Sequence, residues 1–360
     1  MVKEEIKIYS APGRVCLYGE HQDYLKLTVI PAAINLRTKL QIKKNFSETI
    51  KVGSQQLSLK DEFSTMKTLQ MSNNEFDYLR AIILTLYKKK IVDYIPGFDV
   101  KISSEIPIGS GLSSSAALLV SWLTALNDQL NLSLSKTEIA DLCYIAENQI
   151  MGINCGIMDQ FSSSLGGVFS LDCNGPPYEI IPYNTSIQNL VIGDTKMHRA
   201  ANEPLTQLKI QLFSGLNKIQ RQESHNLRNL TLNELKNMKE KLTKSEYVKL
   251  HGVIKIRDIT QEAINELSKN KQNLELLGNL LTQQQTILNE NLGVSIPKLD
   301  KLVKASIDVG ALGGKLTGAG LGGCIVALAP GNEESVAKAI EKAGGKAFIC
   351  NIDYSGGTRN

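Results

Sequence analysis

Hydrophobic and polar residues alternate in several short segments of the first half of the chain, a spacing typical of strands. Ile6 and Ile8 form the first alternation, and Val15 and Leu17 form the second. Further strands are predicted at residues 28–34, 38–43, 98–102 and 167–172. Elsewhere in this half, hydrophobic residues recur every three or four positions, which predicts helices over residues 75–89, 114–130 and 135–151.

The second half begins with a predicted strand at residues 189–193 and is then helical in pattern over residues 203–291. Strands return at residues 324–329 and 347–352. A chain of 360 residues is long enough for two domains, and this mixture predicts an α+β fold. The polar, Pro-containing stretch 173–186 is the predicted boundary, so we expect one domain over residues 1–185 and a second over residues 186–360.

Composition narrows the possible partners. Lys and Arg number 40 and Asp and Glu 36, a net charge of +4, and the basic residues are scattered along the chain. A nucleic-acid or membrane surface would need them concentrated, so neither partner is expected. The acidic start without an apolar run argues against a signal peptide, and six well-separated cysteines without a C-x-x-C pair predict reduced thiols. We therefore expect a cytoplasmic monomer or homodimer acting on a small molecule.

The strongest chemical signal is a Gly- and Ser-rich segment over residues 107–117, Pro-Ile-Gly-Ser-Gly-Leu-Ser-Ser-Ser-Ala-Ala. The start of a helix offers unpaired N–H groups and a partial positive charge, and glycines permit close approach to the backbone. One Gly-Ser turn alone would more often be an ordinary helix cap. Three consecutive hydroxyls and two nearby glycines favour a phosphate site, whose residues are Gly109, Ser110, Gly111, Leu112, Ser113, Ser114 and Ser115.

Two other phosphate motifs are excluded. Gly314 and Lys315 are followed by Leu316, and Val309 stands at the first position of the pattern G-x-x-x-x-G-K-[ST], so that pattern fails. Residues 318–323 do match G-x-G-x-x-G, but a dinucleotide site needs a helix after this sequence. A predicted strand follows instead, so we interpret Gly318 and Gly320 as part of a flexible loop.

Ionisable residues gather in two further places. Ten residues at a strand end contain Arg14, Glu20, His21 and Asp23. Such a cluster is either a binding site or an ordinary solvated loop. Glu20, His21 and Asp23 supply donors and acceptors suited to a polyol. Asp159 is predicted in the first turn of a helix and Glu147 at the end of the preceding one; taken alone, each is more often an ordinary helix or surface acid.

These segments, in this order, resemble the GHMP kinase family. Residues 14–24 are similar to the galactokinase signature, residues 107–117 to the family's phosphate loop and residues 315–324 to its third motif, and residues 155–161 are similar to galactokinases in particular. The resemblance is weakest over residues 203–290. It implies a two-domain α+β fold with the active site in the cleft between the domains. It also implies an ATP-dependent kinase that phosphorylates a sugar, first of all at the anomeric hydroxyl.

The resemblance also implies roles for single residues. Asp159 matches the catalytic carboxylate and Arg14 the cation beside it, while Glu20, His21 and Asp23 match sugar-binding positions. Residues that match the magnesium site are Ser115 and Glu147, and those that match the ATP site are Gly109 to Ser114 together with Gly318 and Gly320. ATP and Mg²⁺ are thus the implied cofactors.

Departures from the galactokinase pattern leave alternatives open. Gln22 stands where Thr is usual, residues 25–27 replace a Gly-rich turn, and Pro204 falls where galactokinases carry a sugar-contacting Tyr. Galactose is the first expectation, and arabinose, a uronic acid, fucose, a galactosamine derivative or a heptose stay possible.

A second alternative is a mevalonate-type kinase, because residues 289–324 look similar to that branch. Those enzymes, however, carry Lys at the position of Arg14 and an apolar residue at that of Asp23. A third alternative is a non-catalytic, sugar-sensing member of the family. The presence of both Asp159 and Arg14 argues against it.

Overall fold

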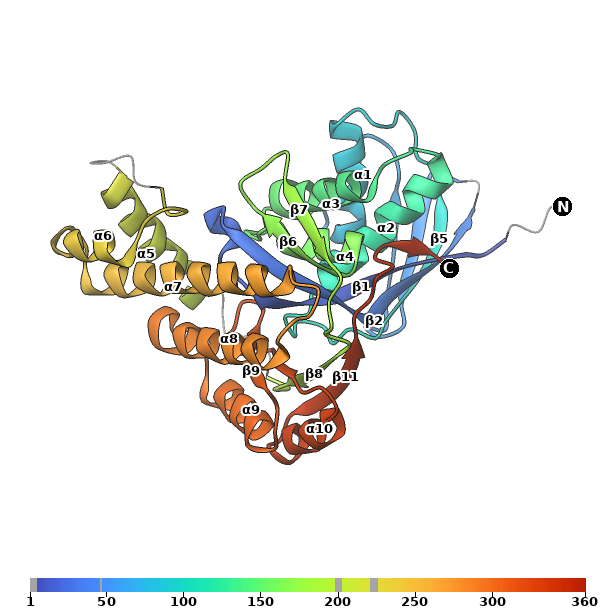
Figure 1. Cartoon of the computed structure of the whole chain (residues 1–360). Helices are drawn as coiled ribbons and strands as arrows, with labels where there is room; N and C mark the ends of the chain where they lie inside the picture. Colours follow the sequence, from blue (N-terminus) through green and yellow to red (C-terminus); the bar gives the residue numbers. More distant parts are fainter. Residues whose placement is uncertain (1–4, 46, 198–202, 221–225) are drawn as a thin grey trace.

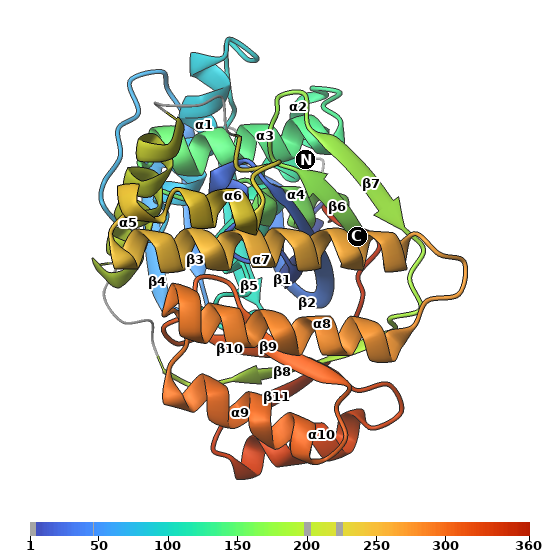
Figure 2. The ribbon, with the colours of Figure 1, turned by 60° about the vertical axis from the view of Figure 1, so that its left-hand side comes forward.

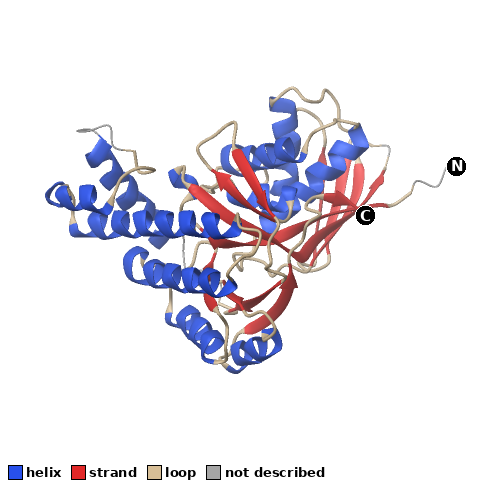
Figure 3. Cartoon of the chain, viewed as in Figure 1, coloured by secondary structure: helices blue, strands red, loops and turns tan. Residues whose placement is uncertain are grey.

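The computed structural model describes residues 5–45, 47–197, 203–220 and 226–360. The molecule contains a larger mixed sheet and a smaller antiparallel sheet, each covered by helices, and a group of long helices extends to one side (Figures 1 and 3). The expected α+β class is confirmed.

The larger sheet contains the predicted strands of the first half. Its main order is β12-β1-β2-β5-β3-β4, and β6 pairs with β2 and with β7. The strands are β1 (Lys7–Tyr18), β2 (Thr28–Lys44), β3 (Thr49–Ser54), β4 (Leu59–Ser64), β5 (Phe98–Ser104), β6 (Val168–Asp172), β7 (Glu179–Tyr183) and β12 (Thr358–Arg359). Of these, β3, β4, β7 and β12 were not predicted.

One long strand replaces two predicted ones. The pairing of β2 with β1 jumps from Pro12–Arg37 to Gly13–Ile34, so two residues of β2 are left out of the ladder. Such a bulge lets a strand bend without ending. On one side of the bulge β2 pairs with β5, and on the other side it pairs with β6. The same strand therefore belongs to both branches of the larger sheet.

Four helices cover one face of the larger sheet: α1 (Asp77–Lys88), α2 (Ser114–Leu130), α3 (Lys136–Ile145) and α4 (Met158–Leu165). The helix predicted over residues 114–130 is confirmed, and its buried Trp122 meets Phe98 of β5 edge to face at 6.0 Å between ring centroids. The helix predicted over residues 135–151 ends earlier. It passes at Ala146–Ile150 into a π-helical turn, an irregularity often found at functional sites.

The smaller sheet has the order β11-β8-β10-β9, with strands β8 (Asn189–Asp194), β9 (Gly313–Thr317), β10 (Cys324–Leu328) and β11 (Lys346–Asn351). Helices α9 (Pro297–Asp308) and α10 (Glu333–Lys342) pack on it. The unpredicted β9 begins with Gly313, where a Cβ would collide with the backbone of Gly278 in α8 (Leu274–Ile287). Glycine is needed there for the close approach of helix and strand.

The helical prediction over residues 203–291 is confirmed for the described residues. This region contains α5 (Glu203–Gln220), α6 (Leu232–Asn237), α7 (Lys244–Leu267), α8 and a π-helical turn at Leu288–Leu292. Figures 1 and 2 both show α7 between α8 and the pair α5 and α6. No helix within the described ranges is long and apolar enough to cross a membrane.

The chain passes from the larger to the smaller sheet between Tyr183 and Asn189, a segment that overlaps only the end of the stretch 173–186 interpreted as a boundary, because β7 lies within that stretch. It returns at its end, because β12 pairs with β1. Arg37 of β2 holds this returning segment: it forms an ion pair with Asp353 and donates to the Gly356 carbonyl at 2.6 Å. The last residues of the chain therefore pack on the larger sheet and not on the smaller one.

Replacing Arg37 with Met should destabilise the protein by about 3 kcal/mol, because Asp353 is left buried without its cation. Both side chains are almost inaccessible, at 12% and 7% exposure. The matched control is Lys304→Met, which breaks an exposed pair with Asp308 and should change stability by at most about 0.5 kcal/mol. Denaturant unfolding followed by fluorescence measures both variants. Equal effects of the two substitutions would show that the Arg37 tether is not structural.

Candidate active site

Four segments that are distant in sequence meet where the two sheets adjoin. They are the end of β1 with the turn that follows it, the loop before α2, the segment joining α3 to α4, and the β9–β10 loop. Most of the residues singled out from the sequence lie on these segments.

Arg14 and Asp159 form the centre of this arrangement. Arg14 is 3% exposed and donates from Nε at 2.8 Å and from Nη2 at 2.6 Å to Oδ1 of Asp159. Its Nη1 donates to the Gly111 carbonyl at 2.5 Å. The Asp159 side chain keeps 30% exposure at the first turn of α4, so a charge-compensated carboxylate faces outward.

The loop before α2 wraps around this pair. The backbone of Ser113 is left-handed, with φ 62°, a conformation that is uncommon for a residue with a Cβ. It directs the Ser113 hydroxyl to Oδ2 of Asp159 at 2.6 Å. Ser113, expected only as part of the phosphate loop, thus also orients the carboxylate.

The other residues of the loop differ in what they offer. Gly109 is exposed and has open space around its Cα, as a backbone phosphate site requires. The Ser110 hydroxyl is turned back to the Pro107 carbonyl at 2.7 Å, and the Leu112 side chain is buried in the core. Only the backbone of Ser110 and Leu112 remains available to a phosphate, while Ser114 is half-buried at the start of α2.

The glycines of the β9–β10 loop close over the same place. Gly318 and Gly320 both have positive φ, at 82° and 77°. A Cβ on Gly323 would collide with the carbonyl of Ser110, so the two glycine-rich loops are in contact. A strand precedes and a strand follows this loop, which confirms that it is not a dinucleotide fingerprint.

Glu147 lies in the π-helical turn and is 5% exposed. Burial and the neighbouring charge of Asp159 raise the pKa of Glu147 to about 7, against opposing hydrogen bonds from Ser115 and Gln160. The Gln160 amide donates to Oε2 at 2.6 Å. A buried carboxylate of this kind gains from a cation close by.

Asp23 and His21 lie on the turn after β1. Asp23 accepts from the Tyr24 N–H at 2.9 Å, and a Cβ on Gly156 would collide with its carboxylate, so the segment before α4 lies directly against it. Burial first, and Asp159 second, raise the pKa of Asp23 to about 6. His21 has a φ of 62°, and its Nδ1 lies 3.1 Å from the Tyr24 hydroxyl.

Glu20 occupies a deeper position. Its carboxylate is 1% exposed, forms an ion pair with the fully buried Lys315 of β9, and accepts from the Gly318 N–H. Lys315 also donates to the Cys16 carbonyl at 3.0 Å and the Leu316 carbonyl at 2.8 Å. The structure therefore shows Glu20 as the link between the turn after β1 and the glycine loop, and a direct contact with sugar stays a prediction.

Several residues of the site were not found from the sequence. Lys315 was considered only as part of a failed phosphate motif, and Gln160 and Gly156 were read only as parts of their segment. Lys209 of α5 was missed altogether. It reaches the segment before α4 and donates to the Asn154 carbonyl at 2.9 Å.

Gln22, a departure from the galactokinase pattern, is buried. Its Nε2 donates to the Val253 carbonyl of α7 at 3.1 Å. Pro204 lies at the start of α5, and residues 198–202 of the segment noted for its missing Tyr are outside the described residues.

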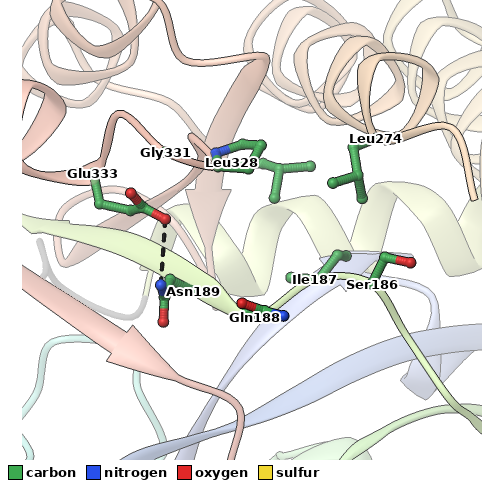
Figure 4. Close-up of a pocket in the computed structure, with 9 residues that line it drawn as sticks. Ser186, Ile187, Gln188, Asn189, Leu274, Leu328, Gly331 and Glu333 are labelled. Carbon is green, nitrogen blue, oxygen red and sulfur yellow. Dashed lines mark hydrogen bonds between the residues drawn. The ribbon is translucent and has the colours of Figure 1, made fainter.

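A separate pocket lies away from all these motifs, between the start of α8, the β10–α10 connection and the chain entering β8 (Figure 4). Asn189 and Glu333 bridge one wall at 3.3 Å, and Leu274 and Ile187 line the other side. None of the residues predicted for catalysis or binding lines this pocket.

Known proteins similar to this chain are GHMP kinases. Three family models match the chain: the galactokinase galactose-binding signature at residues 2–44, the GHMP kinases N terminal domain at residues 77–167 and the GHMP kinases C terminal domain at residues 260–348. A galactokinase of Clostridium beijerinckii is 31% identical and covers 94% of this chain and 89% of the relative. One of Thermococcus kodakarensis is 29% identical and covers 95% of both.

Solved structures share the fold of this chain. Lactococcus lactis galactokinase complexed with galactose superposes with a TM-score of 0.88 at 28% identity, covering 98% of this chain and 95% of that one. Methanococcus jannaschii mevalonate kinase shares the fold with a TM-score of 0.72 at 24% identity, covering 97% and 98%. The chain therefore belongs to the GHMP kinase family, in its galactokinase branch, and is an ATP-dependent sugar kinase.

Proposed function

We propose that this kinase transfers the γ-phosphate of ATP to the anomeric hydroxyl of galactose. The observation that supports this most strongly is the Arg14–Asp159–Ser113 arrangement, which leaves one charge-compensated carboxylate facing outward beside the phosphate loop. The similarity to galactokinases over nearly the whole chain supports galactose as the acceptor. The six cysteines, all free thiols and five of them buried, support a reducing, cytoplasmic location.

In this proposal the Asp159 carboxylate accepts the proton of the sugar hydroxyl as that oxygen attacks the γ-phosphorus and the bond to ADP breaks. Each carboxylate oxygen has two lone pairs, so Asp159 can accept from the sugar while it keeps Arg14 and Ser113. Arg14 stays in place throughout because the Gly111 carbonyl and Asp159 hold it. Phosphoryl transfer needs mainly such positioning and charge stabilisation.

The same proposal includes Mg²⁺ at Glu147 and Ser115. A hydroxyl and a carboxylate are oxygen ligands of the type that Mg²⁺ takes. Burial, and then the charge of Asp159, raise the pKa of Glu147, and a bound cation would offset both effects. Mg²⁺ usually keeps waters and phosphate oxygens, so two protein ligands suffice. When bound, the ion would neutralise charge on the phosphates. Among the described residues no group of three or more His, Cys, Asp or Glu could hold a metal ion.

The direct test is a panel of a dozen sugars plus mevalonate, assayed for ATP consumption with the wild type and with Asp159→Asn. Galactose should give the highest kcat/KM, and Asp159→Asn should lower kcat by about 10²–10⁴ while nucleotide affinity is retained. Asp308→Asn, an exposed acid on α9, is the matched control. Retention of more than about a tenth of the activity in Asp159→Asn would remove this residue from catalysis.

The magnesium proposal has its own test. Glu147→Gln and Ser115→Ala should each raise the Mg²⁺ concentration for half-maximal activity by about tenfold or more. Ser121→Ala, which removes a hydroxyl bonded only to the Leu118 carbonyl within α2, is the control. Unchanged Mg²⁺ titrations in both site variants would show that the ion binds elsewhere.

Asp23 should give sugar binding a pH dependence. With its pKa raised to about 6, Asp23 loses its charge as the pH falls through 6, and with it an acceptor for the sugar hydroxyls. At saturating MgATP, kcat/KM for galactose should therefore fall about tenfold for each pH unit below 6. Asp23→Asn should be slow with a flatter profile over this range. A wild-type profile that is level between pH 5 and 7 would contradict the role of Asp23.

A further inference from the structure

Lys209 connects α5 with the segment before α4 and with the turn after β1, which carries Asp23. From the second turn of α5 it donates to both the carbonyl and the Oδ1 of Asn154, at 2.9 and 3.1 Å. Its Nζ also lies 4.5 Å from the centroid of the Tyr24 ring. One half-buried cation therefore holds the segment before α4 and the turn after β1 against the same helix.

Tyr24 is held from a second point of α5. Phe213, one helical turn beyond Lys209, packs against the Tyr24 ring with centroids 6.4 Å apart. Residues four apart lie on one helix face, so Lys209 and Phe213 both contact the Tyr24 ring. Tyr24 in turn donates its N–H to Asp23 at 2.9 Å.

Tyr24 and the segment that contains Asn154 both border Asp23. Tyr24 fixes one carboxylate oxygen, and Gly156, two residues after Asn154, leaves the space in which the carboxylate lies. Lys209 also acts on Asp23 through its charge. Burial lowers the pKa of Lys209, and the attraction of Asp23 opposes this effect.

We propose that Lys209 is a positioning residue of the acceptor site: by tying α5 to Asn154 and Tyr24, it sets the place of Asp23 and hence the affinity for the sugar. The inference rests on the proposed function to the extent that Asp23 binds sugar hydroxyls. Lys209 does not contact Arg14, Asp159 or the phosphate loop through any of these bonds. Its loss should therefore weaken acceptor binding and leave the phosphate side intact.

The experiment compares Lys209→Met, which keeps the apolar stem, with Lys209→Arg, which keeps the charge and can still donate to Asn154 and stack on Tyr24. Lys209→Met should raise KM for galactose about tenfold, because it removes the cation–π contact with Tyr24 and both hydrogen bonds to Asn154. The kcat and KM for ATP should stay within about twofold. Lys209→Arg should return KM for galactose to within about threefold of the wild type.

Lys218→Met is the matched control on the same helix. It breaks the pair of Lys218 with the buried Glu246, so it should lower the melting temperature without changing KM for galactose. Sugar-induced shifts of the melting temperature measure binding without turnover in every variant. If Lys209→Met leaves KM for galactose within twofold, or raises KM for ATP equally, the proposal is overturned.

The sugar panel on the wild type distinguishes a wrong choice of sugar from a wrong role of Lys209. A wild type that does not phosphorylate galactose contradicts the choice of sugar, and Lys209→Met is then measured with the best acceptor of the panel. A rise of KM confined to that acceptor supports Lys209 as a positioning residue. A fall of kcat without a rise of KM overturns the proposal for any acceptor.

Discussion

A buried ion pair between Lys315 and Glu20 joins the two halves of this kinase. Lys315 is in the middle of β9, in the smaller sheet, and is fully inaccessible; Glu20 follows β1 of the larger sheet and is 1% exposed. Two charges without water are tolerated only when their remaining hydrogen-bonding capacity is used. Here Lys315 donates to two carbonyls as well, and Glu20 accepts the Gly318 N–H. A second bond, from the Cys16 N–H to the Thr317 hydroxyl at 2.9 Å, lies beside it.

The geometry of the site follows from this junction. With β9 fixed to the end of β1, the glycine loop after β9 must cover the loop before α2, and Gly323 touches Ser110. The turn after β1 carries Asp23 at the same time, so acceptor residues and phosphate loops share one anchor. Arg14, two residues before Cys16 on β1, bonds Asp159. A kinase gains from such rigidity because correct positioning supplies much of the rate.

Much of this could be predicted from the sequence, and what could not has physical reasons. Alternating residues predicted β1, strand-like hydrophobic patterns predicted β5, β6 and β10, and three-to-four spacing predicted α2. The glycine-containing turn before Asp159 led us to expect a helix with Asp159 in its first turn, which is α4. The strand β9 was missed because two glycines and a lysine suggest an exposed loop, and the partner of that lysine is 295 residues away. β3 was missed although Ile50 and Val52 alternate with polar residues, since short edge hairpins give weak patterns.

The contacts of the site were harder to predict than its residues. Motif order indicated Arg14 and Asp159, but nothing local indicates that Ser113 adopts a left-handed backbone and bonds Asp159. Lys209 lies in a polar helical stretch where many lysines point to solvent. Only the packing of α5 on Tyr24 distinguishes it from them.

The central claim is that this site moves a phosphoryl group from ATP to the anomeric oxygen of a sugar, and ³¹P NMR of the reaction mixture tests it most directly. With ATP, Mg²⁺ and galactose, the γ-phosphate signal should disappear while a new phosphorus signal, coupled to the anomeric proton of galactose, appears in equal amount. A phosphorus signal coupled to another position of the sugar, or release of inorganic phosphate alone, would contradict it.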